Sequence, residues 1–353
     1  MARNSRLSSS RRAKPNRAYR RRVRTLRAEQ LESRRLLALI TWDAGGDGSS
    51  WNDPLNWSGD VLPTSADDVV ISLPTSNPTI RLSSADASVA SLVADEALRV
   101  ESGRTLTVTG TADINAALTI DGGTLRNGAW DIADGSLSFT SNTSTLDAVT
   151  LAQPLTITGG RVEVTGGTTF PSAQLDGGSL GVEPGFSLPG NIDIQGTSAS
   201  YLYVVGNGTA TIPAGRTVTV GSSATLYLGQ SPDQAIGGDR SDAWFNVGTL
   251  ETTSGTIHIL AGAFLNESGA TVAAGTGNIY VQTRTTENRL GAAMRTVGGN
   301  LEIRPEKPYP VSFQNDGTVE VHNGTFDTNV GWNYSDTGTL ILDNATTTFG
   351  GSV

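Results

Sequence analysis

Cysteine is absent from the 353-residue chain. Its absence excludes disulfide bonds, thiolate zinc sites and cysteine nucleophiles. Lysine occurs only at Lys14 and Lys307, and just 17% of the residues are charged, whereas glycine occurs 42 times. A surface built from exposed helices normally carries more charge than this. The composition therefore favours many short strands joined by tight turns.

Long apolar runs are also missing. The longest candidate near the N-terminus is Leu36–Ile40, whereas a membrane-spanning helix needs about 20 apolar residues and a secretory h-region about 7–15. The sequence therefore predicts no transmembrane span, and Leu36–Ile40 is a poor match to an ordinary signal peptide.

Charge divides the chain into two parts. Residues 1–40 hold 13 Lys and Arg against two Glu, whereas residues 41–353 hold 12 basic and 32 acidic side chains. We expect residues 1–40 to form a disordered basic leader, and the border with the acidic body lies near Ile40.

Alternating apolar and polar residues recur along the body and are followed by glycine or asparagine turns. Examples are the segments 105–110, 154–170, 216–229, 277–283 and 338–344. Alternation places one set of side chains on each face of a strand. The phrase LT[IV]-x-G recurs at 106, 118 and 155, and no segment concentrates aromatic residues as a compact core would.

These features predict an all-β protein, although a β-sandwich would also give strands at such intervals. We favour a single-stranded right-handed parallel β-helix, or β-solenoid, with repeats over residues 76–353. At roughly 20–29 residues per coil, about ten to fourteen coils are expected. The chain ends in strand-like sequence without a visible cap, so it is either a fragment of a longer protein or capped in an unrecognised way.

One segment departs from this pattern. Residues 284–307 contain five of the body's twelve basic residues, and 285–296 is the best helix candidate because Leu290 and Met294 lie four residues apart. We interpret the segment as a lateral loop or short helix. The alternative is a ligand face for an anionic polymer, formed by Arg284, Arg289, Arg295, Arg304 and Lys307.

Few residues could support catalysis. His258 and His322 are far apart in strand-like sequence, which excludes a zinc pair at short spacing. Ser179 has the letters of G-x-S-x-G around it, but we interpret 177–181 as a turn because no strand–turn–helix context surrounds it. The carboxylates considered for acid–base work cannot be placed together from sequence: Asp113, Asp121, Asp131, Asp134 and Asp176. We therefore expect no enzymatic activity.

No cofactor or metal is expected either. The segment Asp43–Asp53 offers oxygen ligands for a structural calcium ion, yet it lacks the spacing and the closing Glu of an EF-hand loop. The basic leader could contact phosphates. The acidic body and the single aromatic residue of the leader, Tyr19, argue against specific nucleic-acid binding.

A short motif near the charge border resembles a known signal. Residues 27–38, RAEQLESRRLLA, resemble the LEPR-XLL motif of large extracytoplasmic proteins of planctomycete bacteria, with Ser33 standing where the motif has proline. The matching positions are Leu31, Glu32, Arg34, Leu36 and Leu37. The resemblance implies an export or sorting segment followed by a long, repetitive, β-rich protein outside the cytoplasm.

The next segment, 41–71, resembles the opening unit of bacterial β-helical surface and autotransporter-like passenger proteins. The residues that carry this resemblance are Trp42, Trp51, Asn56, Trp57, Pro63, Asp67 and Asp68. Three closely spaced tryptophans can cover an open first coil, so we expect a capping unit over 41–75. Carbohydrate stacking on the indole rings is the alternative.

The sequence thus predicts an exported, structural or adhesive cell-surface β-helix whose partners are surface or matrix components, including polysaccharide. A polysaccharide lyase or hydrolase is the first alternative, and nucleic-acid binding through the basic arm is the second. The oligomeric state is not indicated.

Overall fold

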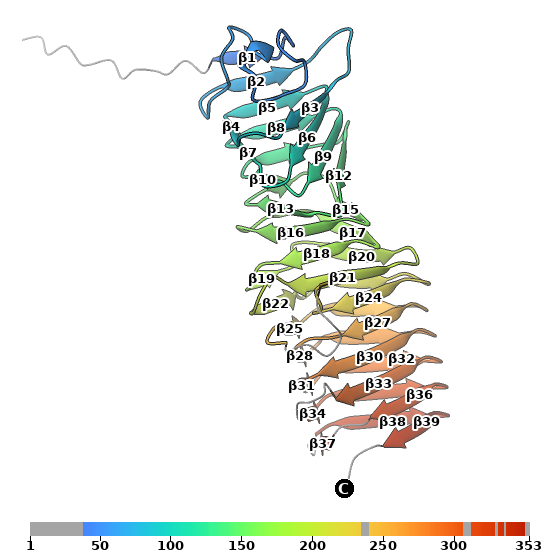
Figure 1. Cartoon of the computed structure of the whole chain (residues 1–353). Coiled ribbons are helices and arrows are strands. Elements are labelled where there is room, and N and C mark those ends of the chain that lie inside the picture. The colour runs from blue at the N-terminus through green and yellow to red at the C-terminus, as the bar shows by residue number, and fades with distance from the viewer. Residues whose placement is uncertain (1–37, 234–239, 306–311, 329–330, 335–336, 350–353) are drawn as a thin grey trace, which may run out of the picture. The chain divides into compact units, whose positions relative to one another are not determined.

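The computed structural model describes residues 38–233, 240–305, 312–328, 331–334 and 337–349. Within these ranges the chain is a parallel β-solenoid of about 12 turns (Figure 1). The only helix described there is the single turn η1 (Pro54–Asn56). The all-β, parallel solenoid prediction is confirmed. The leader lies outside the described residues apart from its last three, and Leu39 and Ile40 belong to the first strand.

Three sheets form the N-terminal coils. The six-stranded sheet consists of β1 (Leu39–Thr41), β2 (Asp68–Ile71), β5 (Ser91–Ala94), β8 (Thr111–Ile114), β11 (Ala129–Asp131) and β14 (Thr150–Leu151). The four-stranded sheet consists of β3 (Thr79–Leu82), β6 (Ala97–Glu101), β9 (Ala117–Asp121) and β12 (Ser136–Phe139). The third is the long sheet, which continues through the C-terminal coils.

The long sheet has 13 strands. They are β4 (Ala87–Val89), β7 (Thr105–Val108), β10 (Thr124–Arg126), β13 (Thr143–Asp147), β16 (Arg161–Thr165), β18 (Ser179–Val182), β21 (Ala199–Val204), β24 (Thr225–Leu228), β27 (Thr256–Ile259), β30 (Asn278–Thr283), β33 (Asn300–Pro305), β36 (Thr325–Thr328) and β39 (Thr346–Phe349).

Two further sheets complete the C-terminal coils. The nine-stranded sheet consists of β15 (Leu155–Thr158), β17 (Ser172–Asp176), β20 (Asn191–Gln195), β23 (Thr217–Val220), β26 (Thr249–Thr252), β29 (Thr271–Ala274), β32 (Ala293–Val297), β35 (Thr318–His322) and β38 (Thr339–Asp343). The seven-stranded sheet consists of β19 (Phe186–Ser187), β22 (Thr209–Ile212), β25 (Ala243–Asn246), β28 (Ala263–Asn266), β31 (Thr285–Asn288), β34 (Ser312–Asn315) and β37 (Gly331–Tyr334).

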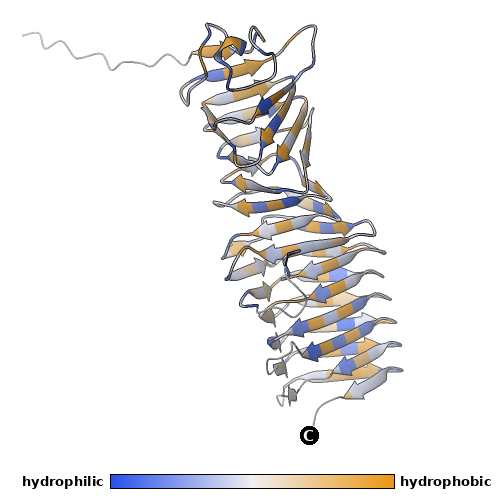
Figure 2. Cartoon of the chain, in the orientation of Figure 1, coloured by the Kyte–Doolittle hydropathy of each residue, from blue (hydrophilic) through white to orange (hydrophobic). Residues whose placement is uncertain are grey.

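Alternating burial within each strand fills the interior. Strands β24 and β27 both show the pattern of half-buried and buried residues in turn, and the same alternation of polar and apolar residues is visible along the arrows in Figure 2. In the long sheet the register aligns Leu226, Ile257 and Ile279 in one inward row, and all three are fully buried. Each such side chain contributes about 1.5–3 kcal/mol by leaving water.

A polar ladder runs through the same interior. Asn246, Asn266, Asn288 and Asn315 occupy the last positions of β25, β28, β31 and β34 and are fully buried. Each of the first three donates from Nδ2 to the Oδ1 of the next, over 2.8, 2.9 and 2.7 Å. The four amides also donate to backbone carbonyls of Thr271, Ala293, Thr318 and Thr339. Paired amides can be buried at little cost, whereas unpaired ones cannot.

Glycine is required directly before strands β33 and β36 of the long sheet, where the backbones of neighbouring coils approach each other most closely. A Cβ on Gly299 would lie 1.7 Å from the carbonyl oxygen of Gly277, and a Cβ on Gly324 would lie 2.0 Å from that of Gly299. Any larger residue would push neighbouring coils apart, so this column of glycines reflects backbone packing and not only turn geometry.

Two local predictions are wrong. Residues 285–296 form no helix: they supply β31 and the first part of β32, with Leu290 exposed and Met294 buried. The preceding coil offers both strands a complete hydrogen-bonding edge, and this tertiary pairing overrides local helix propensity. The interpretation of 177–181 as a turn holds only for its start, because Ser179 begins strand β18. No helix follows, so a nucleophile elbow is excluded.

We predict that Asn266→Ala will lower the free energy of unfolding by about 1–3 kcal/mol, because it leaves buried amide groups of its neighbours without a partner. Urea denaturation followed by circular dichroism measures this. The control Glu251→Ala, at an exposed position of β26, should change stability by less than about 0.5 kcal/mol. Equal effects of the two substitutions would show that the ladder does not stabilise the stack.

Candidate functional site on the outer face of the long sheet

Aromatic residues line up on the outer face of the long sheet. The register pairs Tyr201 with Tyr227, Tyr227 with His258, and His258 with Tyr280, on the consecutive strands β21, β24, β27 and β30. All four rings alternate with buried, inward-facing neighbours and are themselves half-buried. The coil repeat therefore assembles residues that are widely and irregularly spaced in the sequence.

The rings form a continuous stack. Their centroids are 5.1, 4.7 and 4.9 Å apart, and the ring planes differ by 14°, 6° and 18°. These distances match the spacing of about 4.8 Å between neighbouring strands. The next residue in register after Tyr280 is Glu302, so the stack of rings ends at Tyr280.

A groove of about 500 Å³ lies along this stack. Its lining residues come from the four strands β24, β27, β30 and β33 and the residues just after them: Thr225, Tyr227, Thr256, His258, Leu260, Tyr280, Val281, Gln282 and Arg304. Hydroxyl, imidazole, amide and guanidinium groups thus border the aromatic rings. Arg304 also forms an ion pair with Glu302 on the same strand.

His258 is the titratable group in the middle of the stack. Burial between its neighbours lowers the pKa of the imidazole below its ordinary value, and the charge of Arg304 lowers this pKa further. His258 is therefore neutral at pH 7, and its ring stacks on the two tyrosines without adding charge to the groove.

A second polar cluster lies on the same face, where it extends from β16 to β21 at the N-terminal end of the ring stack. Arg161 donates from Nε to the hydroxyl oxygen of Tyr203 at 2.8 Å and forms ion pairs with Glu163, at 3.3 Å, and with Asp233. The Tyr203 hydroxyl donates to Glu163 Oε1 at 3.2 Å. The Tyr203 ring lies over Gly181, where a Cβ would approach Tyr203 Cζ to 2.7 Å.

This arrangement keeps Tyr203 protonated. Its side chain is almost fully buried, and burial followed by the charge of Glu163 raises the pKa of the phenol well above its ordinary value. A groove of about 400 Å³ adjoins the cluster and is lined in part by Arg161, Ser179 and Asp233. Two carboxylates therefore pair with one guanidinium beside this groove.

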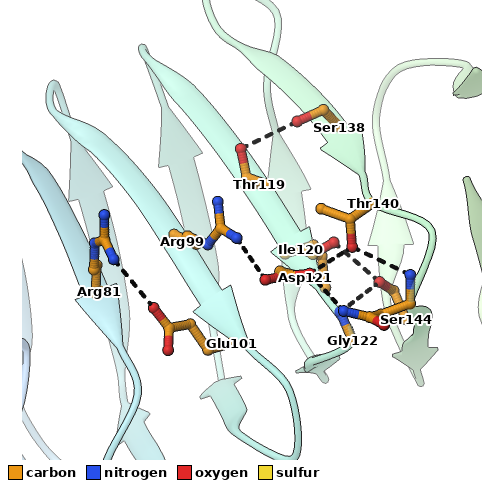
Figure 3. Close-up of polar contacts among 11 residues, drawn as sticks. Arg81, Arg99, Glu101, Thr119, Ile120, Asp121, Gly122, Ser138, Thr140 and Ser144 are labelled. Atoms are coloured by element: carbon orange, nitrogen blue, oxygen red, sulfur yellow. Dashed lines mark hydrogen bonds and ion pairs between the residues drawn. The ribbon is translucent and has the colours of Figure 1, made fainter.

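Other ion pairs on the outer surface connect neighbouring coils (Figure 3). Arg99 on β6 pairs with Asp121 on β9 at 2.5 Å, and Arg81 on β3 pairs with Glu101 on β6 at 3.7 Å. Hydrogen bonds from Thr140 and Asn142, together with that from Arg99, lower the pKa of Asp121. Its oxygens are thus engaged in holding the stack together.

The other carboxylates considered from sequence are dispersed. Asp113 and Asp131 are register partners on the six-stranded sheet, Asp134 lies in the turn after β11, and Asp176 ends β17 of the nine-stranded sheet. The structure does not bring them together with Asp121, which ends β9 of the four-stranded sheet. Within the described ranges, no group of three or more His, Asp or Glu is placed to hold a metal ion.

The three tryptophans of the N-terminal unit lie in the interior. Trp42 and Trp57 contact edge to face at 4.8 Å, and Trp51 and Trp57 contact similarly at 4.9 Å. All three are at most 3% exposed and belong to the continuous core. Rings buried to this extent offer no face to a sugar, whereas a structural cap requires this placement.

Polar residues of the same unit hold its loops. Asp67 accepts hydrogen bonds from the backbone N–H and the hydroxyl of Thr64, both at 2.7 Å, in the turn that follows Pro63, and Asp68 accepts one from Ser91 at 2.5 Å. In the loop considered for calcium, Asp47 Oδ1 accepts from Ser49, Ser50 and Asn56. These hydrogen bonds account for the lowered pKa of Asp47.

The basic residues of 284–307 do not form one face. Arg289 follows β31 of the seven-stranded sheet and pairs with Glu267 at 2.7 Å and Glu287 at 2.9 Å. Arg295 lies on β32 of the nine-stranded sheet, in register with Glu320. Arg304 lies on the long sheet, and Arg284 lies between β30 and β31. Lys307 and the sorting motif Leu31–Leu37 lie outside the described residues.

Comparison of the chain with protein-family models, with curated proteins and with solved structures gives no match. In the part of the chain that the structure describes, no helix is long and apolar enough to cross a membrane.

Sequence reasoning missed the ring stack. It treated His258 as an ordinary strand histidine, did not consider Tyr201, Tyr227 or Tyr280, and did not consider the Arg161 cluster. The signal available in the sequence was an aromatic residue at an outward-facing position in each of four strands whose apolar and polar residues alternate. Using that signal requires the coil boundaries, which the irregular turns conceal.

We predict that the stability advantage of the wild type over His258→Phe will fall as the pH drops. The ordinary histidine pKa of about 6.5 is restored on unfolding, so the unfolded chain takes up the proton more readily than the folded one. The contribution of His258 is complete above pH 6.5 and declines below it, towards the lower pKa of the folded state.

Urea unfolding of both proteins between pH 5 and 8 measures this difference. The carboxylates common to the two proteins make the same pH-dependent contribution to both free energies of unfolding, so this contribution cancels in their difference. Phenylalanine preserves an aromatic ring in the stack. A stability difference that stays constant over the whole pH range would contradict the assignment.

Proposed function

We propose that the protein is an exported structural or adhesive β-helix of a bacterial cell surface. The observation that carries the proposal is the use of charge on the solenoid. Arginines pair with carboxylates one coil away, as in Arg99–Asp121, Arg126–Asp147 and Arg289–Glu267. Ion pairs of this kind hold neighbouring coils together. This role suits a scaffold whose outer faces contact partners.

Two features of the N-terminal region support export. The segment Leu31–Leu37 resembles an extracytoplasmic sorting motif, and the tryptophan-rich unit that follows resembles the opening unit of β-helical surface proteins. The absence of cysteine is compatible with a location inside or outside the cytoplasm, so it favours neither. The expected partners are surface or matrix components, including polysaccharide.

A polysaccharide-active enzyme is the second candidate. It is favoured by the Arg161 cluster, in which Glu163 and Asp233 flank a guanidinium beside a groove and Tyr203 remains a neutral phenol. Glycoside hydrolysis uses two carboxylates on either side of the scissile bond. In this cluster, however, both carboxylates pair with the same arginine, which favours a role in holding Asp233 against the long sheet.

Nucleic-acid binding has less support. The body carries 32 acidic against 12 basic side chains, and Arg161, Arg289 and Arg304 are ion-paired with carboxylates. Such a surface repels a polyanion, so any contact with nucleic acid would depend on the basic leader alone.

We predict that the protein will be recovered from the cell-surface fraction with a mature N-terminus that begins shortly after Ala38. Cell fractionation followed by N-terminal sequencing measures this. A version without residues 2–37 keeps strand β1 and should remain in the cytosol, because it lacks the sorting motif. Full-length protein found in the cytosol with Met1 or Ala2 still present would contradict export.

The enzymatic candidate predicts that purified full-length protein releases reducing or unsaturated ends from a polysaccharide panel, and that Glu163→Gln reduces this release at least about 100-fold. Arg126→Gln, which breaks the ion pair with Asp147 away from the groove, is the control. We expect no release above background from any of the three proteins. Release that depends on Glu163 would replace the structural proposal with the enzymatic one.

A further inference from the structure

We infer that the outer face of the long sheet between β24 and β33 binds a neutral polysaccharide in the groove along Tyr227, His258 and Tyr280. The inference rests on the proposed surface function and specifies the ligand of that function. Three features of the groove carry it: its length, the chemistry of its lining and its charge.

The groove extends across coils. Its lining residues come from β24, β27, β30 and β33 and the residues just after them, so it spans three strand spacings, or about 14 Å. Small-molecule sites are mainly enclosed apolar cavities, whereas this groove lies open on the outer face of a sheet. An extended chain laid along the coil stack fits this form better than a compact ligand.

The lining alternates ring and hydrogen-bonding groups. Pyranose rings have an apolar C–H face and an edge of hydroxyl groups, so their binding sites combine aromatic carbon with polar side chains. The stacked rings of Tyr227, His258 and Tyr280 line the groove, and Thr225, Thr256 and Gln282 line it beside them. Tyr280 ends the stack, because the next residue in register is Glu302.

The charge of the groove favours a neutral polysaccharide over an anionic one. Among the described residues that line the groove, Arg304 is the only cation, and it is paired with Glu302. The half-buried imidazole of His258 has a lowered pKa and is neutral at pH 7. The groove therefore offers no uncompensated positive charge to a uronate or a phosphate. The excess of acidic residues over the whole body repels polyanions further.

The stack provides its own control. Tyr201 and Tyr280 are its two end rings, but only Tyr280 lines the groove. Tyr280→Ala and Tyr201→Ala each remove one ring contact from the stack, so they should alter stability similarly. Their effects on ligand binding should differ.

The test is affinity electrophoresis and isothermal titration calorimetry of the full-length chain with dextran, galactomannan and hydroxyethyl cellulose as neutral probes, and with alginate and duplex DNA as anionic probes. We expect binding to at least one neutral probe. Tyr280→Ala should weaken it about tenfold or more, as truncation of a central aromatic contact does. Tyr201→Ala should change it less than about threefold.

Circular dichroism of each variant establishes that it is folded. If Tyr280→Ala fails to fold, Arg304→Gln and Thr256→Val alter the same groove without removing a ring, and loss of binding in both supports the inference. Failure of the wild type to bind any neutral probe, binding only to alginate or DNA, or equal effects of the Tyr201 and Tyr280 variants would each overturn it. None of these results bears on export, which fractionation tests separately.

Discussion

Parallel, in-register stacking of coils is the constraint on which the rest of this structure depends. Because each strand of the long sheet pairs with the strand one coil before it, every side chain meets its counterpart at about 4.8 Å. Aliphatic residues, amides and aromatic rings can all be stacked on their own kind at that distance. Rows of leucine and isoleucine, the asparagine ladder and the tyrosine–histidine stack are three results of the same geometry.

Several charged residues share a register column with a like charge: Arg81 with Arg99, Glu101 with Asp121, and Asp113 with Asp131. On the four-stranded sheet the arginine column lies beside the carboxylate column, and Arg99 pairs across them with Asp121 on the next coil. Exposed pairs of this kind add little stability individually, but they offset part of the repulsion within each column of like charges. A repeat that uses few charged residues leaves hydroxyls and rings as the main groups on its outer faces.

Much of the fold could be predicted from the sequence, because strand alternation and glycine turns are local signals. The strand predicted at 277–283 is β30 with one residue fewer. The helix predicted at 285–296 was wrong because a complete strand edge on the neighbouring coil outweighs two apolar residues at helical spacing. The candidate site could not be predicted, since turns of unequal length separate Tyr201, Tyr227, His258 and Tyr280, and their alignment exists only once the coils are stacked.

By itself, the sequence determined the all-β class, the absence of disulfides, and the division into a basic leader and an acidic body, since composition and two-residue periodicity suffice for these. Only the tertiary structure decided which outward residues become neighbours. It buried the three tryptophans, dispersed the arginines of 284–304 over several faces, and brought four distant rings into one row beside a groove. The physical reason is that a solenoid's lateral contacts are set by its register, and that register is a property of the whole stack.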